Sequence, residues 1–102
     1  MAETATMTVS GIGDPARLPP GQRHWVLASK RRRDTLDVLK EESQPLALPE
    51  LAAAIARLER NTGQLDDETV RHLATELHHI HLPMMADCGI VSYAAQPSFG
   101  EL

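Results

Sequence analysis

The chain is poor in aromatic residues and in cysteine. One Trp, one Tyr and one Phe among 102 residues mean that a hydrophobic core has to be built from Leu, Ile, Val, Ala and Met. The only cysteine, Cys88, excludes an intrachain disulfide and fits a reducing compartment. No apolar run approaches the roughly 18 residues that a membrane-spanning helix needs. The first residues also lack the basic and apolar segments of a signal peptide, so we expect a cytoplasmic protein without membrane contact.

Positive charge is also scarce, because ten Lys and Arg stand against 14 Asp and Glu and the formal net charge is −4. This balance argues against nonspecific polyanion binding by the protein as a whole, although a local basic patch stays possible. The sequence contains no nucleophile–base set, no paired carboxylates and no phosphate-binding loop with Lys-Ser/Thr. We therefore expect no enzyme and no cofactor.

The N-terminal residues show no apolar periodicity. Residues 1–20 are interrupted by glycine and proline and end in Pro19-Pro20. We interpret them as a flexible arm that carries no fixed structure. The remainder, residues 21–102, is long enough for one small domain, and domains of this size are often stabilised by oligomerisation.

Short helices and one short strand are predicted next. Residues 22–28 favour a helix, and Ser29 is a suitable N-cap for another helix over about 30–42. The apolar triplet Leu46-Ala47-Leu48 suits one small strand, and Pro49 is a good residue for the first turn of the helix that follows.

The strongest helical pattern lies in the second half of the chain. Asp66 or Asp67 is predicted to cap it, Pro83 to kink it or divide it, and Gly89 to stop it. The residues expected on its buried face recur at alternating intervals of three and four: Val70, Leu73, Leu77, Ile80 and Met84.

A β-hairpin is expected after this helix. Residues 90–93 are strand-like, and residues 98–102 are interpreted as a weak second strand. The complete order is helix, short strand, helix, helix, strand, strand. This order predicts a mainly α fold with a small β-hairpin, namely a winged helix-turn-helix domain.

Particular motifs support this fold by resemblance. Lys30-Arg31-Arg32-Arg33-Asp34-Thr35-Leu36-Asp37-Val38-Leu39 and Pro49-Glu50-Leu51-Ala52 resemble the first and second helices of archaeal winged-helix regulators. His79-Ile80-His81-Leu82-Pro83, followed by Ala86-Asp87-Cys88-Gly89-Ile90-Val91, closely resembles a haloarchaeal family of small winged helix-turn-helix domains of unknown function. A looser resemblance links the chain to ArsR-type repressors. The resemblance covers about residues 25–93 and implies DNA-binding transcriptional regulation.

The polar face of the third helix is the candidate for base recognition. On a helical wheel it lies opposite the apolar face and also includes Leu82. Its candidate DNA contacts are Arg71, Thr75, His78 and His79. A solvated polar face is the alternative, since one arginine stands against five carboxylates between Asp66 and Cys88.

The only basic cluster is Lys30-Arg31-Arg32-Arg33. Four cations at a helix N-terminus oppose the helix dipole, which favours a role in phosphate contact for Arg31, Arg32 or Arg33. The alternative is a solvated face on which Lys30–Asp34 and Arg33–Asp37 form ion pairs.

A metal site is not predicted. His78, His79, His81 and Cys88 are possible ligands, but only His81 and Cys88 share a helix face, and two ligands do not close a site. His81 is better interpreted as a hydrogen-bonded core histidine, and Cys88 as a small buried residue.

Together these features predict a homodimeric regulator that binds double-stranded DNA and dimerises through the helix around Trp25. One alternative is a winged-helix module that binds a protein partner, for which an apolar patch around Leu82 and Met85 is expected. A weaker alternative is a metal- or pH-responsive switch that acts through the histidines.

Overall fold

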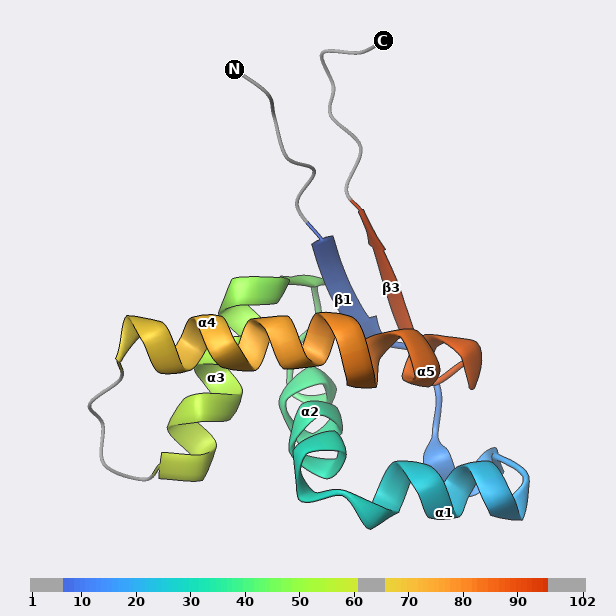
Figure 1. Cartoon of the computed structure of the whole chain (residues 1–102). Helices are drawn as coiled ribbons and strands as arrows, with labels where there is room; N and C mark the ends of the chain where they lie inside the picture. The colour runs from blue at the N-terminus through green and yellow to red at the C-terminus, as the bar shows by residue number, and fades with distance from the viewer. Residues whose placement is uncertain (1–6, 61–65, 96–102) are drawn as a thin grey trace, which may run out of the picture.

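The structure, a computed structural model, describes residues 7–60 and 66–95. These residues form a mainly helical fold with a small three-stranded antiparallel sheet, which confirms the expected class and is compatible with a winged helix (Figure 1). The elements in chain order are β1 (Met7–Gly11), a 3₁₀ turn η1 (Pro15–Arg17), α1 (Pro20–Ala28), α2 (Lys30–Lys40), β2 (Leu46–Ala47), α3 (Leu48–Arg60), α4 (Asp67–Glu76), a π-helical turn η2 (Leu77–His81), α5 (Leu82–Asp87) and β3 (Val91–Ala95).

The N-terminal segment is the centre of the sheet. Strand order is β2-β1-β3, so β1 is hydrogen-bonded on both sides, and the side chain of Val9 is fully buried. The prediction of a flexible arm over residues 1–20 is therefore wrong from Met7 onward, and residues 1–6 lie outside the described residues. The residues of β1 show no apolar pattern that would predict a strand. The segment is extended because it pairs with β3, which lies at the other end of the sequence.

The partner of β3 differs from the expected one. Five residue pairs join it to β1, from Met7 opposite Ala95 to Gly11 opposite Val91. The second strand that the sequence suggested at residues 98–102 lies outside the described residues. The antiparallel pair that follows the third helix is thus built from two segments that are far apart in the sequence.

A single residue forms the corner between α1 and α2. Ser29 has an extended backbone that ends α1, and its hydroxyl accepts a hydrogen bond at 3.3 Å from the Arg32 N–H. This confirms the predicted cap, which satisfies a free donor in the first turn of α2.

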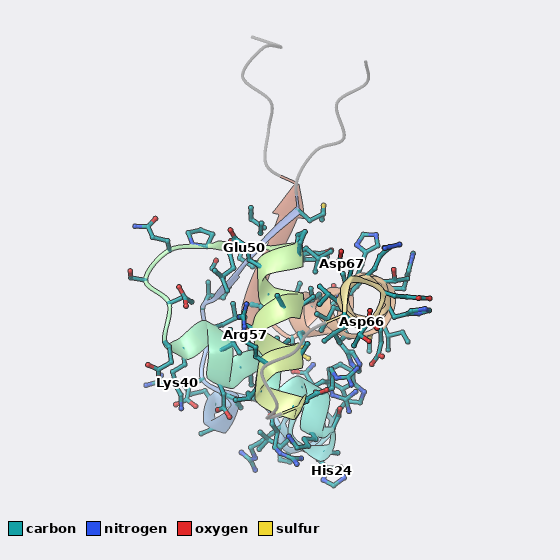
Figure 2. All side chains as sticks on the ribbon, turned by 90° about the vertical axis from the view of Figure 1, so that its left-hand side faces the viewer. His24, Lys40, Glu50, Arg57, Asp66 and Asp67 are labelled. Carbon is teal, nitrogen blue, oxygen red and sulfur yellow. The ribbon has the colours of Figure 1, made fainter. Side chains whose placement is uncertain are left out.

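The third helical segment forms one uninterrupted rod over residues 67–87, composed of α4, η2 and α5 (Figure 1). Figure 2, turned by 90°, shows this rod almost end-on beside α3. A π-turn, rather than a break, precedes Pro83, and the Leu82 N–H donates to the Leu77 carbonyl five residues back. Since proline cannot make the regular helical hydrogen bond, this wider turn carries the chain past it.

The π-turn changes which side chains face the core. A π-turn contains more residues than an α-turn, so the buried face moves forward along the sequence beyond Leu77. Ile80 and Met84, expected to be buried, are 55% and 48% exposed. His81, Leu82 and Met85 are buried instead.

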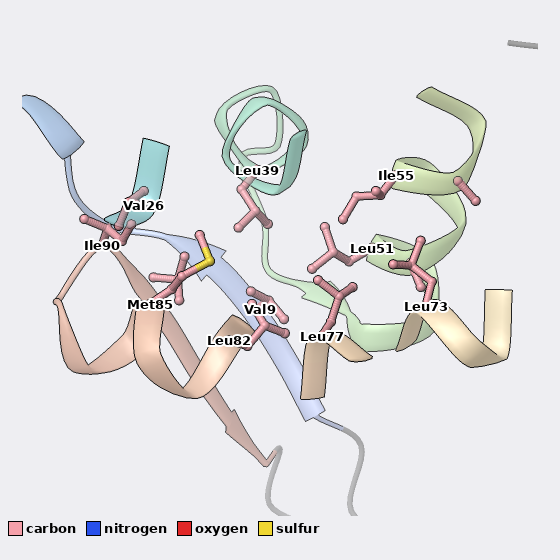
Figure 3. Close-up of a cluster of buried hydrophobic side chains, with 13 residues drawn as sticks. Val9, Val26, Leu39, Leu51, Ile55, Leu73, Leu77, Leu82, Met85 and Ile90 are labelled. Atoms are coloured by element: carbon pink, nitrogen blue, oxygen red, sulfur yellow. The ribbon is translucent and has the colours of Figure 1, made fainter. Parts of the chain in front are cut away.

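The core lies between the rod, α2, α3 and β1 (Figure 3).

Gly89 ends the rod with φ of +83°, as the predicted stop requires. The Gly89 and Ile90 N–H groups donate to the carbonyls of Ala86 and Met85, which is a Schellman motif. The Ile90 carbonyl then accepts from the N–H groups of Ile12 and Gly13, so this turn also holds the chain that follows β1.

Candidate nucleic-acid interface

The outer face of the rod carries three of the four residues predicted on the third helix. Arg71, Thr75 and His79 are exposed, and the Thr75 hydroxyl donates to the Arg71 carbonyl at 3.0 Å. In Figure 2, side chains of the rod project into solvent on the side away from α3. An open helix face of this kind can approach another macromolecule without rearrangement of the fold.

His78 lies apart from these three residues. It is half-buried, and its Nδ1 is 2.6 Å from the Tyr93 hydroxyl of β3. Leu82, predicted on the same polar face, is fully buried. Both differences follow from the π-turn, which rotates the residues after Leu77 relative to a regular helix.

Arg31 is part of an ion cluster that joins three helices. Its Nε and Nη2 donate to the Glu59 carboxylate at 2.8 and 3.0 Å, and its Nη1 donates to Glu76 at 2.8 Å. The hydrogen bond with Glu59 is the main reason that the pKa of Arg31 is raised. The guanidinium thus connects α2 to α3 and α4 and is already engaged within the fold.

Arg32 and Arg33 contact α1. The Arg32 guanidinium lies 3.8 Å from the centre of the Trp25 ring and donates twice to the Trp25 carbonyl, at 2.9 and 2.6 Å. Its partial burial lowers the pKa of Arg32. Arg33 is exposed and donates to the Leu27 carbonyl at 2.6 Å. Of the three arginines predicted to contact phosphate, Arg33 has the most exposed position.

One of the two predicted ion pairs is present. Lys30 lies 2.9 Å from Asp34, whose side chain is only 9% exposed. The carboxylate of Asp37 lies instead near Lys40, at 4.0 Å, and among the described residues it forms no pair with Arg33. In this basic cluster, Lys30, Arg31 and Arg32 therefore make contacts within the fold, and Arg33 is the one exposed arginine.

His81 extends the Arg31 cluster into the π-turn. It is buried, as expected for a core histidine, and its Nε2 is 2.8 Å from the second Glu76 oxygen. Burial alone raises the pKa of the Glu76 carboxyl, but the hydrogen bond to His81 and the charge of Arg31 outweigh it, so the net pKa lies below the ordinary 4.5. Cys88 is half-buried against the core. Within residues 7–60 and 66–95, no group of three or more His, Cys, Asp or Glu side chains could hold a metal ion.

The lowered pKa of Glu76 predicts a loss of stability in acid. A carboxyl whose pKa is depressed by folding stabilises the fold above its unfolded pKa, and this contribution disappears as the pH falls through its folded pKa. Glu76→Gln should therefore reduce the free energy of unfolding at pH 7, and the difference from the wild type should shrink below about pH 4.5. Urea unfolding at several pH values measures this. Glu42→Gln, which removes an exposed carboxylate outside the cluster, is the control, and a difference that stays constant with pH would contradict the prediction.

Exposed apolar side chains occupy a different place from the one expected. Leu82 and Met85, predicted to form a patch, are both fully buried. Ile80 and Met84 are exposed instead, and Pro83 lies exposed between them in sequence. The sequence pattern could not identify this surface because the π-turn exchanges the buried and exposed positions.

A groove of about 1110 Å³ runs beside α2 and is bordered by residues 11–15. Its lining mixes the cations Lys30 and Arg33 with the anions Asp34 and Asp37. Such alternating charge does not form a phosphate-binding surface, which needs an excess of positive charge.

In the described part of the chain, the helices are too short or too polar to cross a bilayer. No curated protein and no solved structure matches the sequence. One family model does match, the domain of unknown function DUF7344, over residues 24–98. The match begins inside α1 and extends beyond β3, whereas β1 and η1 precede it. Because the match covers most of the chain, this protein belongs to the DUF7344 family.

Proposed function

We propose that this chain is a DNA-binding transcriptional regulator of the winged-helix type, which acts in the cytoplasm as a homodimer and uses the rod of residues 67–87 as its recognition helix. The observation that carries this proposal is the open outer face of the rod, where Arg71, Thr75 and His79 are exposed. The element order around the rod and the motif resemblance give it further support.

The chemistry of these three side chains suits base edges. The major groove of DNA admits an α-helix, arginine can donate twice to guanine, and threonine can contact several bases. The three residues are spaced four apart, so at about 1.5 Å per residue they extend over roughly 12 Å of helix. That length corresponds to about three base pairs at ~3.4 Å each.

The surrounding charge predicts modest affinity. Asp66, Asp67 and Glu68 precede Arg71 at the start of the rod and are repelled by phosphate. Arg71 is the only Lys or Arg between Asp66 and Cys88, so counterion release contributes little to the binding free energy. Recognition then depends on base-edge contacts and on the two copies of the rod that a homodimer provides.

Arg71→Ala tests the proposal. Binding of the full chain to a labelled mixed-sequence duplex is measured by fluorescence anisotropy over a range of salt concentrations. We expect the substitution to weaken binding about tenfold, as for the loss of one good arginine contact to a base, and to change the salt slope little. Arg17→Ala is the matched control, because Arg17 is an exposed arginine in η1. This turn contacts α1, and α1 and the start of α4 lie on opposite sides of the molecule (Figure 1).

Two results would overturn the proposal. One is the absence of binding at low salt. The other is an equal loss of affinity in both variants, which would mean that only total charge matters and that the rod is not the contact surface.

A protein-binding module is the second candidate. It is favoured by the exposure of Ile80 and Met84, at 55% and 48%, which are four residues apart on the rod. For this function DNA binding should be absent, while Ile80→Glu combined with Met84→Glu should abolish association with the partner and leave the fold intact.

A further inference from the structure

A short hydrogen bond connects β3 to the π-turn. The Tyr93 hydroxyl lies 2.6 Å from Nδ1 of His78, and the two rings meet edge to face at a centroid distance of 5.9 Å. His79, the next residue, is exposed, and its ring contacts His78 edge to face at 4.7 Å. Of these two adjacent histidines, only His78 is recorded with a side-chain hydrogen bond in the described chain.

The direction of this hydrogen bond follows from the chemistry of the two groups. In a neutral imidazole one nitrogen donates and the other accepts, and a partner at one nitrogen decides which. A phenol is a stronger donor than a neutral imidazole N–H, so the Tyr93 O–H donates to Nδ1. Burial raises the pKa of Tyr93, which keeps the phenol protonated. The proton of the imidazole is then on Nε2.

Nε2 of His78 is the ring nitrogen that Tyr93 does not contact. Among the buried side-chain nitrogens and oxygens of the described chain, only Nδ1 of His81 lacks a hydrogen-bond partner. Nε2 of His78 is not one of these buried atoms and has no hydrogen-bond partner among the described residues, so it keeps some exposure to solvent. It therefore presents an N–H group at the edge of the rod that is next to β3.

We propose that Tyr93 is a positioning residue that holds His78 in the Nε2–H tautomer, so that His78 donates a hydrogen bond to an acceptor on DNA. Purine N7, guanine O6 and phosphate oxygens are the acceptors of suitable chemistry. The proposal rests on the proposed function for its ligand, but not for the tautomer. It gives β3 a specific part in recognition, because the strand then sets the hydrogen-bonding character of a side chain on the helix.

The tautomer is measured directly by the ¹⁵N chemical shifts of the His78 ring in the full chain. At pH 8 we expect the shift of a protonated nitrogen at Nε2 and of an unprotonated one at Nδ1. Tyr93→Phe removes the hydroxyl and keeps the ring, so the two tautomers should become mixed. The affinity for the duplex should fall about threefold to tenfold, as for the loss of one oriented hydrogen bond.

Ser92→Ala is the matched control, because it removes an exposed hydroxyl from the same strand. It should change neither the His78 shifts nor the affinity. A protonated Nδ1 in the wild type overturns the proposal whether or not DNA binds. A mixed tautomer in Tyr93→Phe with unchanged affinity overturns the contact between His78 and DNA. If the tautomer is as expected but the wild type binds no DNA, the proposed function fails and the DNA contact with it, whereas the role of Tyr93 in holding His78 stands.

Discussion

A chain that begins at Ile12 should lose the cooperative unfolding transition of the full chain. The truncation removes β1, which forms every strand pairing recorded in the sheet. Val9 alone contributes about 1.5–3 kcal/mol through its burial, and each lost backbone hydrogen bond adds about 0.5–1.5 kcal/mol. A domain of this size has a free energy of unfolding of only about 5 kcal/mol or somewhat more. Urea titration followed by circular dichroism measures the effect.

Two further chains make this experiment specific. A chain that begins at Met7 keeps the whole strand and should keep a cooperative unfolding transition. Val9→Ala keeps the strand and removes only its buried side chain, so it should cost about 2 kcal/mol. A stable, cooperatively folded chain without residues 1–11 would show that the N-terminal segment is dispensable and that the sheet does not depend on it.

Leu82→Ala should lower the free energy of unfolding by about 2–5 kcal/mol, whereas Ile80→Ala should change it by no more than about 0.5 kcal/mol. The two residues lie two positions apart, yet Leu82 is fully buried and Ile80 is 55% exposed. A regular α-helix with the spacing of three and four would place Ile80 in the core instead. The pair therefore measures the effect of the π-turn on the buried face of the rod.

Met85→Ala and Met84→Ala repeat this comparison one turn later. Met85 is fully buried and Met84 is 48% exposed, so only the first substitution should be costly. These two residues have the same side chain, which removes differences of size and chemistry from the comparison. Equal losses in both pairs, or a larger loss at Ile80 than at Leu82, would mean that the rod has no π-turn.

The features that could be predicted from sequence depend on neighbouring residues. The Ser29 cap, the Gly89 stop and the Lys30–Asp34 pair all act within a few positions, and all three are confirmed. The strand at Met7–Gly11 could not be recognised, because only its pairing with a distant segment gives it order. The spacing of three and four predicted a regular α-helix with one buried face, formed by Leu73, Leu77, Ile80 and Met84. The single π-turn moves the last two of these residues out of the core.

The same distinction applies to the candidate site. Arg71, Thr75 and His79 lie within α4 and η2 and were found from helical periodicity. The roles of Arg31 and His78 were missed, because their partners come from other elements: Glu59 and Glu76 from α3 and α4, and Tyr93 from β3. A helical wheel contains no information about such partners.

The pairing of β1 with β3 also determines how this domain can be combined with others. Met7 lies opposite Ala95, so the outer ends of the two strands are neighbours at one end of the molecule (Figure 1). A protein fused before β1 or after β3 would emerge from that end, away from α1. The domain can therefore be inserted into a surface loop of a larger protein, or arranged in tandem, with little distortion of its host.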